Sequence, residues 1–108
     1  MRAALSRVVL DPLLVEGLQG VEPGQRIEVV FVFHRSDGYD LMQHPRGDRD
    51  RPCRGVFALR SPSRPNPIGV TTVDLLAIEG NVLVVRGLDA LDGTPVLDLK
   101  PAQYVDPA

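Results

Sequence analysis

A ten-residue stretch in the middle of the chain holds side chains that suit the binding of anions and of nucleobases. It is RSPSRPNPIG, residues 60–69, with two arginines, one asparagine and three prolines. Arg60 and Arg64 can offer planar guanidinium groups to a carboxylate or a phosphate, and the Asn66 amide can face a base. Each proline fixes its own φ and drives the preceding residue to extended geometry, so little entropy is left to lose on binding.

Two structural alternatives compete with a binding role for this stretch. One is a rigid loop with its arginines in solvent, and the other is a polyproline ligand for a partner domain. The second is disfavoured, because the stretch lies between two apolar strand-like segments and could hardly be free to dock. In either case, we expect Gly69 to let the chain turn sharply back into a strand.

A second polar segment lies near the C-terminus, between two apolar runs, in LDALDGTPVLDLKP, residues 88–101. Asp92-Gly93 is an ordinary hairpin turn by itself, yet a carboxylate at a strand end can also hold a ribose hydroxyl or a ligand amine. His34 ends a wholly apolar segment, where a histidine is more often a satisfied strand-end residue than a catalytic one. Asp92, Asn66 and His34 are therefore candidates for handling a proton, and none is assigned as the base.

Charge is unevenly spread along a chain whose net charge is only −2. Seven of the twelve basic residues, all arginine, lie between Arg35 and Arg64, against four acidic residues. A local cationic face on a nearly neutral protein suits an enzyme that contacts nucleic acid at one site. A charged loop that only keeps the protein in solution would give the same composition.

Several classes of protein are disfavoured. His34, His44 and Cys53 have no recognised metal-ligand spacing, so we expect no metal. There is no glycine-rich phosphate loop of the dinucleotide-binding kind. A single cysteine suits a reducing compartment, and no apolar run is long enough for a signal peptide or a membrane span. We therefore expect a cytoplasmic protein without a membrane partner.

The elements that must position these residues are mainly β. Alternating apolar residues bounded by turn signals predict strands. An N-cap residue followed by a proline predicts a short helix. Glu79-Gly80-Asn81 predicts a hairpin turn. A long polar loop separates the second and third strands. Short strands with little helix indicate a closed or nearly closed antiparallel β-barrel. The expected strands are 6–10, 25–34, 55–59, 69–78, 81–91 and 94–100, the helix is 12–18, and the loop is 35–54.

The two polar segments together resemble the TrmO (YaeB/TsaA-like) family of tRNA methyltransferases. The resemblance is carried by GVFALRSPSRPNPIGVTTVDLLAIEGN and GLDALDGTPVLDLKP, with FVFH and DLMQHPR also similar, and it extends from about Ile27 to Pro101. It implies a single-sheet antiparallel β-barrel that dimerises, binds S-adenosylmethionine and methylates N6 of threonylcarbamoyladenosine beside the anticodon of tRNA.

By motif, the resemblance also implies which residues bind. The cofactor and base cleft would be formed by His34, Arg35, Arg60, Arg64, Asn66, Pro67, Asp92, Gly93, Thr94 and Pro95. Arginines around that cleft would hold the phosphates of the anticodon loop, and the candidates are Arg46, Arg49, Arg51 and Arg54.

The resemblance is incomplete at the N-terminus. Family members begin with a strand resembling IGxIRSP and then a PRQ-like segment, whereas this chain opens at MRAALSRVVLDP, which looks like the family's second strand. We therefore expect one domain, residues 1–108, that lacks the family's first strand. Two functions stay open: a methyltransferase, or a catalytically silent barrel that binds RNA or an adenosyl ligand.

Overall fold

The protein is described by a computed structural model that covers residues 4–34 and 38–102. Within these residues the chain forms seven strands and three short 3-10 helices. The strands are β1 (Leu5–Val9), β2 (Arg26–Val32), β3 (Met42–Gln43), β4 (Arg54–Gly55), β5 (Ile68–Glu79), β6 (Val82–Arg86) and β7 (Val96–Pro101). The 3-10 helices are η1 (Pro12–Leu18), η2 (Pro45–Gly47) and η3 (Val56–Ala58).

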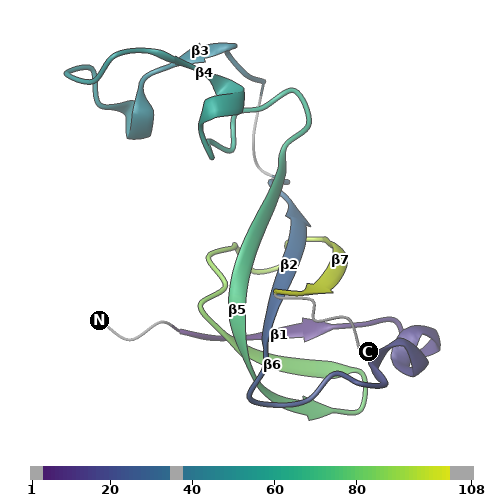
Figure 1. Ribbon diagram of the computed structural model, residues 1–108. Coiled ribbons are helices and arrows are strands. Elements are labelled where there is room, and N and C mark those ends of the chain that lie inside the picture. The colour runs from purple at the N-terminus through teal and green to yellow at the C-terminus, as the bar shows by residue number, and fades with distance from the viewer. Residues whose placement is uncertain (1–3, 35–37, 103–108) are drawn as a thin grey trace, which may run out of the picture.

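Five of these strands make one antiparallel sheet in the order β1-β6-β5-β2-β7 (Figure 1). Its centre is the twelve-residue β5, which pairs with β2 over one half and with β6 over the other. The register shifts between Leu75 and Ala77 of β5, and between Val30 and Phe31 of β2 where β7 pairs. Such bulges bend a sheet, so the two edge strands, β1 and β7, come to line the same cleft.

The hydrophobic core lies on one face of this sheet. Alternate residues of β2 are buried, because successive side chains of a strand point to opposite faces. The residues between them, Val30 and Val32, are only half-buried, so the second face of β2 is less covered than the first. The buried core comprises Val8, Ile27, Val29, Phe31, Val73, Leu75, Leu83 and Val85.

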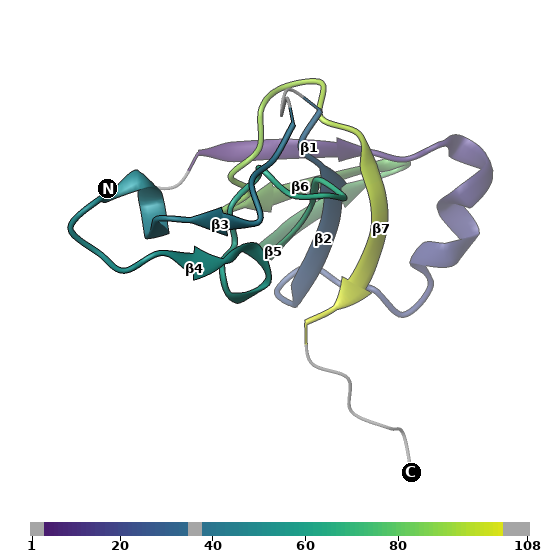
Figure 2. The same ribbon diagram turned by 90° about the horizontal axis from the view of Figure 1, so that it is seen from above.

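The segment between β2 and β5 projects from the sheet, and we call its described residues 38–66 the arm (Figures 1 and 2). Its β3 and β4 form a two-stranded sheet, and the Val56 amide donates to the Leu41 carbonyl at 2.8 Å. The expected strand over 55–59 was wrong. β4 is only Arg54–Gly55, and η3 follows with a hydrogen bond from Leu59 N to Val56 O. A short apolar run is compatible with either a strand or a 3-10 helix, and here Val56 is buried while Phe57 is exposed.

The expected closed barrel is not what the described residues form. β1 pairs with β6 and β7 pairs with β2, and no pairing joins β1 to β7 within 4–34 and 38–102. The fold is therefore mainly β and its main sheet is antiparallel, as expected, but this sheet is open. The short helix over 12–18 and the hairpin at residues 79–81 are confirmed, the helix being a 3-10 turn with Leu13 N donating to the Asp11 carboxylate. In the same parts of the chain, every helix is too short to cross a membrane.

Candidate functional site

The two polar loops singled out in the sequence meet at the end of β2. The amide of Val32 donates to the carbonyl of Pro95 at 3.0 Å, and the amide of Phe33 donates to the carbonyl of Pro67 at 2.7 Å. Consecutive residues of a strand direct their amides to opposite sides, so the two loops flank β2 from its two sides. His34 follows directly and is exposed. The fold therefore gathers three segments that are far apart in the sequence.

The loop over residues 60–69 is held together by its own polar groups. Arg64 is half-buried, and its Nη1 donates to the carbonyls of Leu59 at 2.7 Å and Ser61 at 3.2 Å. The Gln43 side chain, from β3, donates to the Ser63 carbonyl at 2.7 Å and so ties β3 to this loop. Arg64 therefore orders this loop, in addition to any ligand contact that its remaining nitrogens make.

Other predicted residues of this loop are open to solvent. Arg60 is exposed, and its nearest acceptor, the Val70 carbonyl, lies at 3.5 Å, the long limit of a hydrogen bond. The Asn66 side chain is exposed, while its carbonyl accepts from Ile68 N at 2.8 Å. Arg60 and Asn66 are thus placed to meet a ligand from solution, and Pro67 is half-buried against β2.

Gly69 was expected to allow a sharp turn back into a strand, and this reason for a glycine was wrong. Gly69 is a buried residue of β5 opposite Phe31, and it is not among the glycines with positive φ. A Cβ at this position would lie 2.7 Å from Phe31 Cζ and 2.8 Å from Phe33 Cζ. These two rings pack edge to face, with centroids 5.2 Å apart. Glycine is needed here for space beside the rings, which the sequence could not reveal.

The second loop is a turn that borders a large cleft. Gly93 has φ +80, and Thr94 directs both its amide and its hydroxyl to the Leu91 carbonyl. Asp92 is exposed. Four predicted residues line this cleft, namely Asp92, Gly93, Thr94 and Pro95, whereas the other predicted cofactor residues that the structure describes do not. Arg35 lies outside the described residues.

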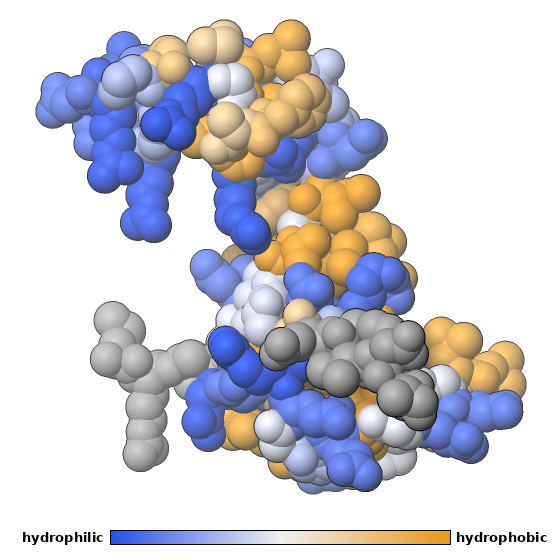
Figure 3. Space-filling view, viewed as in Figure 1, coloured by the Kyte–Doolittle hydropathy of each residue, from blue (hydrophilic) through white to orange (hydrophobic). Residues whose placement is uncertain are grey.

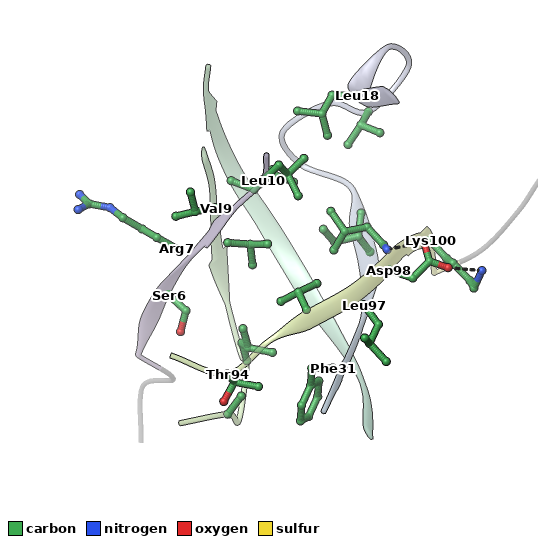
Figure 4. Close-up of a pocket in the computed structure, with 18 of the residues that line it drawn as sticks. Ser6, Arg7, Val9, Leu10, Leu18, Phe31, Thr94, Leu97, Asp98 and Lys100 are labelled. Carbon is green, nitrogen blue, oxygen red and sulfur yellow. Dashed lines mark hydrogen bonds and ion pairs between the residues drawn. The ribbon is translucent and has the colours of Figure 1, made fainter. Parts of the chain in front are cut away.

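The cleft, about 1930 Å³ in volume, lies between the two edge strands. Figure 4 shows Thr94 and Phe31 towards one end and Leu18 towards the other, with Leu97 on β7. An ion pair between Asp98 and Lys100, 2.6 Å long, lies along β7. The sequence-based analysis missed β1, β7 and residues 17–21 as lining. The only hint was that the LSRVVL and PVLDLK segments are rich in apolar residues, and both turned out to be edge strands of the sheet.

In this region, Asp98 and Lys100 are the groups whose pKa departs from its ordinary value. The Lys100 ammonium, and then the Leu99 amide, lower the pKa of Asp98 below its ordinary value. The Asp98 carboxylate in turn raises the pKa of Lys100. The pair fixes two opposite charges on the edge strand, and thus at the border of the cleft.

The four arginines predicted to contact RNA are all exposed on the arm, away from the cleft: Arg46, Arg49, Arg51 and Arg54. In Figure 3 the surface is hollowed between the arm and the sheet. The arm is hydrophilic on one side and apolar on the other, and apolar residues also gather where the arm joins the sheet. Arg46 adopts φ 54 in the turn of η2, and Arg51 forms an ion pair with Asp48 at 3.7 Å. Within 4–34 and 38–102, no three His, Cys, Asp or Glu side chains are placed to share a metal ion.

Comparison with known proteins gives a consistent set of relatives. A probable S-adenosyl-L-methionine-binding protein of Pyrococcus abyssi is 43% identical over 94 residues, covering 87% of this chain and 50% of that protein. One from Methanocaldococcus jannaschii is 46% identical over 90 residues, covering 80% of this chain and 71% of that protein. The crystal structure of TrmO from Pseudomonas aeruginosa matches with a TM-score of 0.72 and 38% identity, over 94% of this chain and 42% of that one.

This chain therefore spans about half the length of the Pyrococcus protein and less than half of the Pseudomonas one. Residues 1–107 match the family described as the tRNA-methyltransferase O N-terminal domain. Taken with the two loops that meet at β2, this match shows that the chain belongs to the tRNA-methyltransferase O family, through that family's N-terminal domain.

Proposed function

We propose that this chain binds S-adenosylmethionine and transfers its methyl group to tRNA, at N6 of threonylcarbamoyladenosine beside the anticodon. The observation that carries the proposal is the meeting of the two loops at the end of β2, through the Val32–Pro95 and Phe33–Pro67 hydrogen bonds. The names of the Pyrococcus and Methanocaldococcus relatives, both probable S-adenosyl-L-methionine-binding proteins, support the cofactor.

The residues around β2 fit the groups of this cofactor. Arg60 offers an exposed cation to a carboxylate, Asn66 offers an amide to a base, and Asp92 offers a carboxylate to a ribose hydroxyl or an amine. When bound, S-adenosylmethionine supplies an electrophilic methyl group. The chain's own task is then to hold both reactants in line, since methyl transfer depends on positioning more than on acid catalysis.

The accepting adenine nitrogen must also lose a proton. Asp92, Asn66 and His34 are the candidates to accept it or to orient the nitrogen, because each is a polar side chain in one of the three segments that meet at β2. Both Asp92 and His34 are exposed, so solvent can carry the proton away from either.

The arm supplies the proposed contacts with tRNA. Arg46, Arg49, Arg51 and Arg54 would neutralise phosphates of the anticodon loop, and binding would weaken as salt is added. The arm also exposes large apolar side chains, which a second copy of the chain would cover in a homodimer. They are Tyr39, Leu41, Met42 and Phe57.

One observation favours the alternative of a silent module that binds RNA or an adenosyl ligand. The sheet is open, and only one of the two predicted loops lines its cleft.

The two functions are separated by paired measurements on the same protein. Titration calorimetry with S-adenosylmethionine tests the site, and transfer of labelled methyl to tRNA that carries threonylcarbamoyladenosine tests the reaction. We expect Asp92→Asn to weaken binding about tenfold, the loss of one contact to a charged group, while Asp89→Asn, an exposed carboxylate of the same loop outside the cleft, leaves binding unchanged. Binding without transfer would establish the silent module that binds an adenosyl ligand. No saturable binding would overturn the methyltransferase and leave only a module that binds RNA.

A further inference from the structure

Two reactive side chains on the arm, neither of them assigned to the proposed methyl-transfer site, are paired with each other. The Cys53 sulfur lies 3.3 Å from His44 Nε2, and His44 Nδ1 lies 2.9 Å from the Arg51 carbonyl oxygen. Because a carbonyl can only accept a hydrogen bond, the proton of the neutral imidazole is on Nδ1. Nε2 is then free of a proton and accepts one from the thiol.

The fold of the arm fixes this pair. Gln43 of β3 is directly opposite Arg54 of β4, so His44 and Cys53 are the next residues along these two strands. The Gln43 amide anchors β3 to the carbonyls of Asp40 and Ser63 at 2.7 Å each. The arrangement contains a nucleophile, a base within hydrogen-bond reach and a third group that orients the base, as activated nucleophiles require.

A small pocket adjoins the thiol in the chain, although neither Cys53 nor His44 is itself among the residues that line it. This pocket of about 460 Å³ is lined by Pro45, Arg51, Pro52, Arg54 and Leu59, which include both chain neighbours of Cys53 and one of His44. Two of the five lining residues are arginines, and Cys53 itself is exposed. Asp48 offsets Arg51 through their 3.7 Å ion pair, which leaves Arg54 as the lining cation with no ion pair among the described residues. The pocket therefore favours a small anionic molecule.

We propose that Cys53 is a modification site that exchanges with small disulfides bearing carboxylates, with His44 as its positioning base. The thiol proton passes to His44 Nε2, and the thiolate sulfur attacks one sulfur of the incoming disulfide. The new bond joins Cys53 to that sulfur, the old S–S bond breaks, and the departing thiolate takes the proton back from the imidazolium. Cys53 is oxidised to a mixed disulfide, and the leaving half of the reagent is reduced to a thiol.

The test measures the rate of mixed-disulfide formation with two probes of opposite charge. These are 5,5′-dithiobis(2-nitrobenzoate), which is anionic, and cystamine, which is cationic, with the single adduct followed by mass spectrometry. We expect the native chain to react with the anionic probe about tenfold faster than the same chain unfolded in urea, and to prefer it over the cationic probe by more than the unfolded chain does.

Three variants assign the effect to named residues. His44→Asn retains a donor for the Arg51 carbonyl but lacks Nε2, so it is expected to lose most of the rate gain. Arg54→Gln is expected to lose the preference for the anionic probe, whereas Arg86→Gln, an exposed arginine on β6, retains it. Circular dichroism checks folding, and Cys53→Ser must take up no label.

Two results would overturn the proposal. One is a native thiol that reacts no faster than the unfolded chain, which needs no variant to be observed. The other is a folded His44→Asn variant that reacts at the wild-type rate. Neither depends on methyl transfer, so this site stands or fails apart from the proposed function.

Discussion

The amide of Phe33 donates to the carbonyl of Pro67 at 2.7 Å, and this bond fastens the proline-rich loop to the end of β2. The preceding residue makes the matching bond to Pro95 on the other loop. Two neighbouring backbone groups of one strand therefore set the spacing between the loops. Changes that loosen the end of β2 should affect both loops together.

Gly69→Ala tests the close approach of β5 to the two phenylalanine rings. The new Cβ would lie within 3 Å of both rings, and Phe31 is only 3% exposed, so the rings have little room to move. We expect a loss of about 1–3 kcal/mol in the free energy of unfolding, as in other overpacked cores. Urea denaturation measures it. Gly55→Ala is the matched control, since nothing lies within 4 Å of its added Cβ, and equal losses in the two variants would contradict the steric reason.

Arg64→Ala tests whether this guanidinium orders the proline-rich loop. It donates to two loop carbonyls, so its loss should cost about 1.5–3 kcal/mol of local stability, the range for hydrogen bonds with a charged partner. Hydrogen exchange of the Ser63 amide, which is bonded to Ser61 Oγ, should accelerate. Arg60→Ala should leave that exchange unchanged, because its contact is at 3.5 Å. An unaltered rate in Arg64→Ala would mean that the prolines order the loop alone.

Asn81→Ala tests the attachment of β1 to the sheet. The Asn81 side chain donates to the Leu10 carbonyl at 2.7 Å, next to a backbone bond from Leu10 N to Asn81 O. We expect a loss of about 1 kcal/mol, since the backbone bond remains. Asn81→Asp keeps the shape but removes the donor, and it should be at least as unstable. Both are measured by urea denaturation, and a wild-type midpoint for Asn81→Asp would show that the amide contributes nothing.

The Asp98–Lys100 pair gives a dependence on pH. The ammonium of Lys100 holds the pKa of Asp98 below its ordinary value of 3.8. A carboxyl whose pKa is lower in the folded state stabilises the fold above pH 3.8, and this contribution is lost as the pH falls through the folded value. Carbon NMR titration of Asp98 should show a higher midpoint in Lys100→Gln, still below 3.8 because the Leu99 amide remains. Identical midpoints would show that the pair does not form in solution.

Alternation of apolar residues predicted the strands that carry the core. In β2 and β6 the buried positions follow a period of two, because one face packs on the core and the other does not. The same pattern misplaced a strand at Val56, where a short apolar run fits a 3-10 turn equally well. The sequence could not predict whether the sheet closes, since closure depends on pairing between β1 and β7 and not on the pattern of either strand.

Prediction of the site was similarly divided. The residue types of the two loops suggested binding segments, which stays a prediction, and the attachment of both loops to β2 was a property of strand pairing. The role of Gly69 required the positions of Phe31 and Phe33, which come from another strand. Arg64 was expected to face a ligand, but the carbonyls within its reach are set by how the prolines fold the loop.

Val56 is 1% exposed and yet lies outside the main core cluster, so the arm has a buried centre of its own. Burial of one such side chain contributes about 1.5–3 kcal/mol, much less than the core of the sheet. The arm is therefore expected to open as a separate cooperative unit while the sheet stays folded. A polyanion that binds only the folded arm would shift the equilibrium between the folded and the unfolded arm. The arginines of the arm therefore couple the unfolding of the arm to the concentration of that ligand.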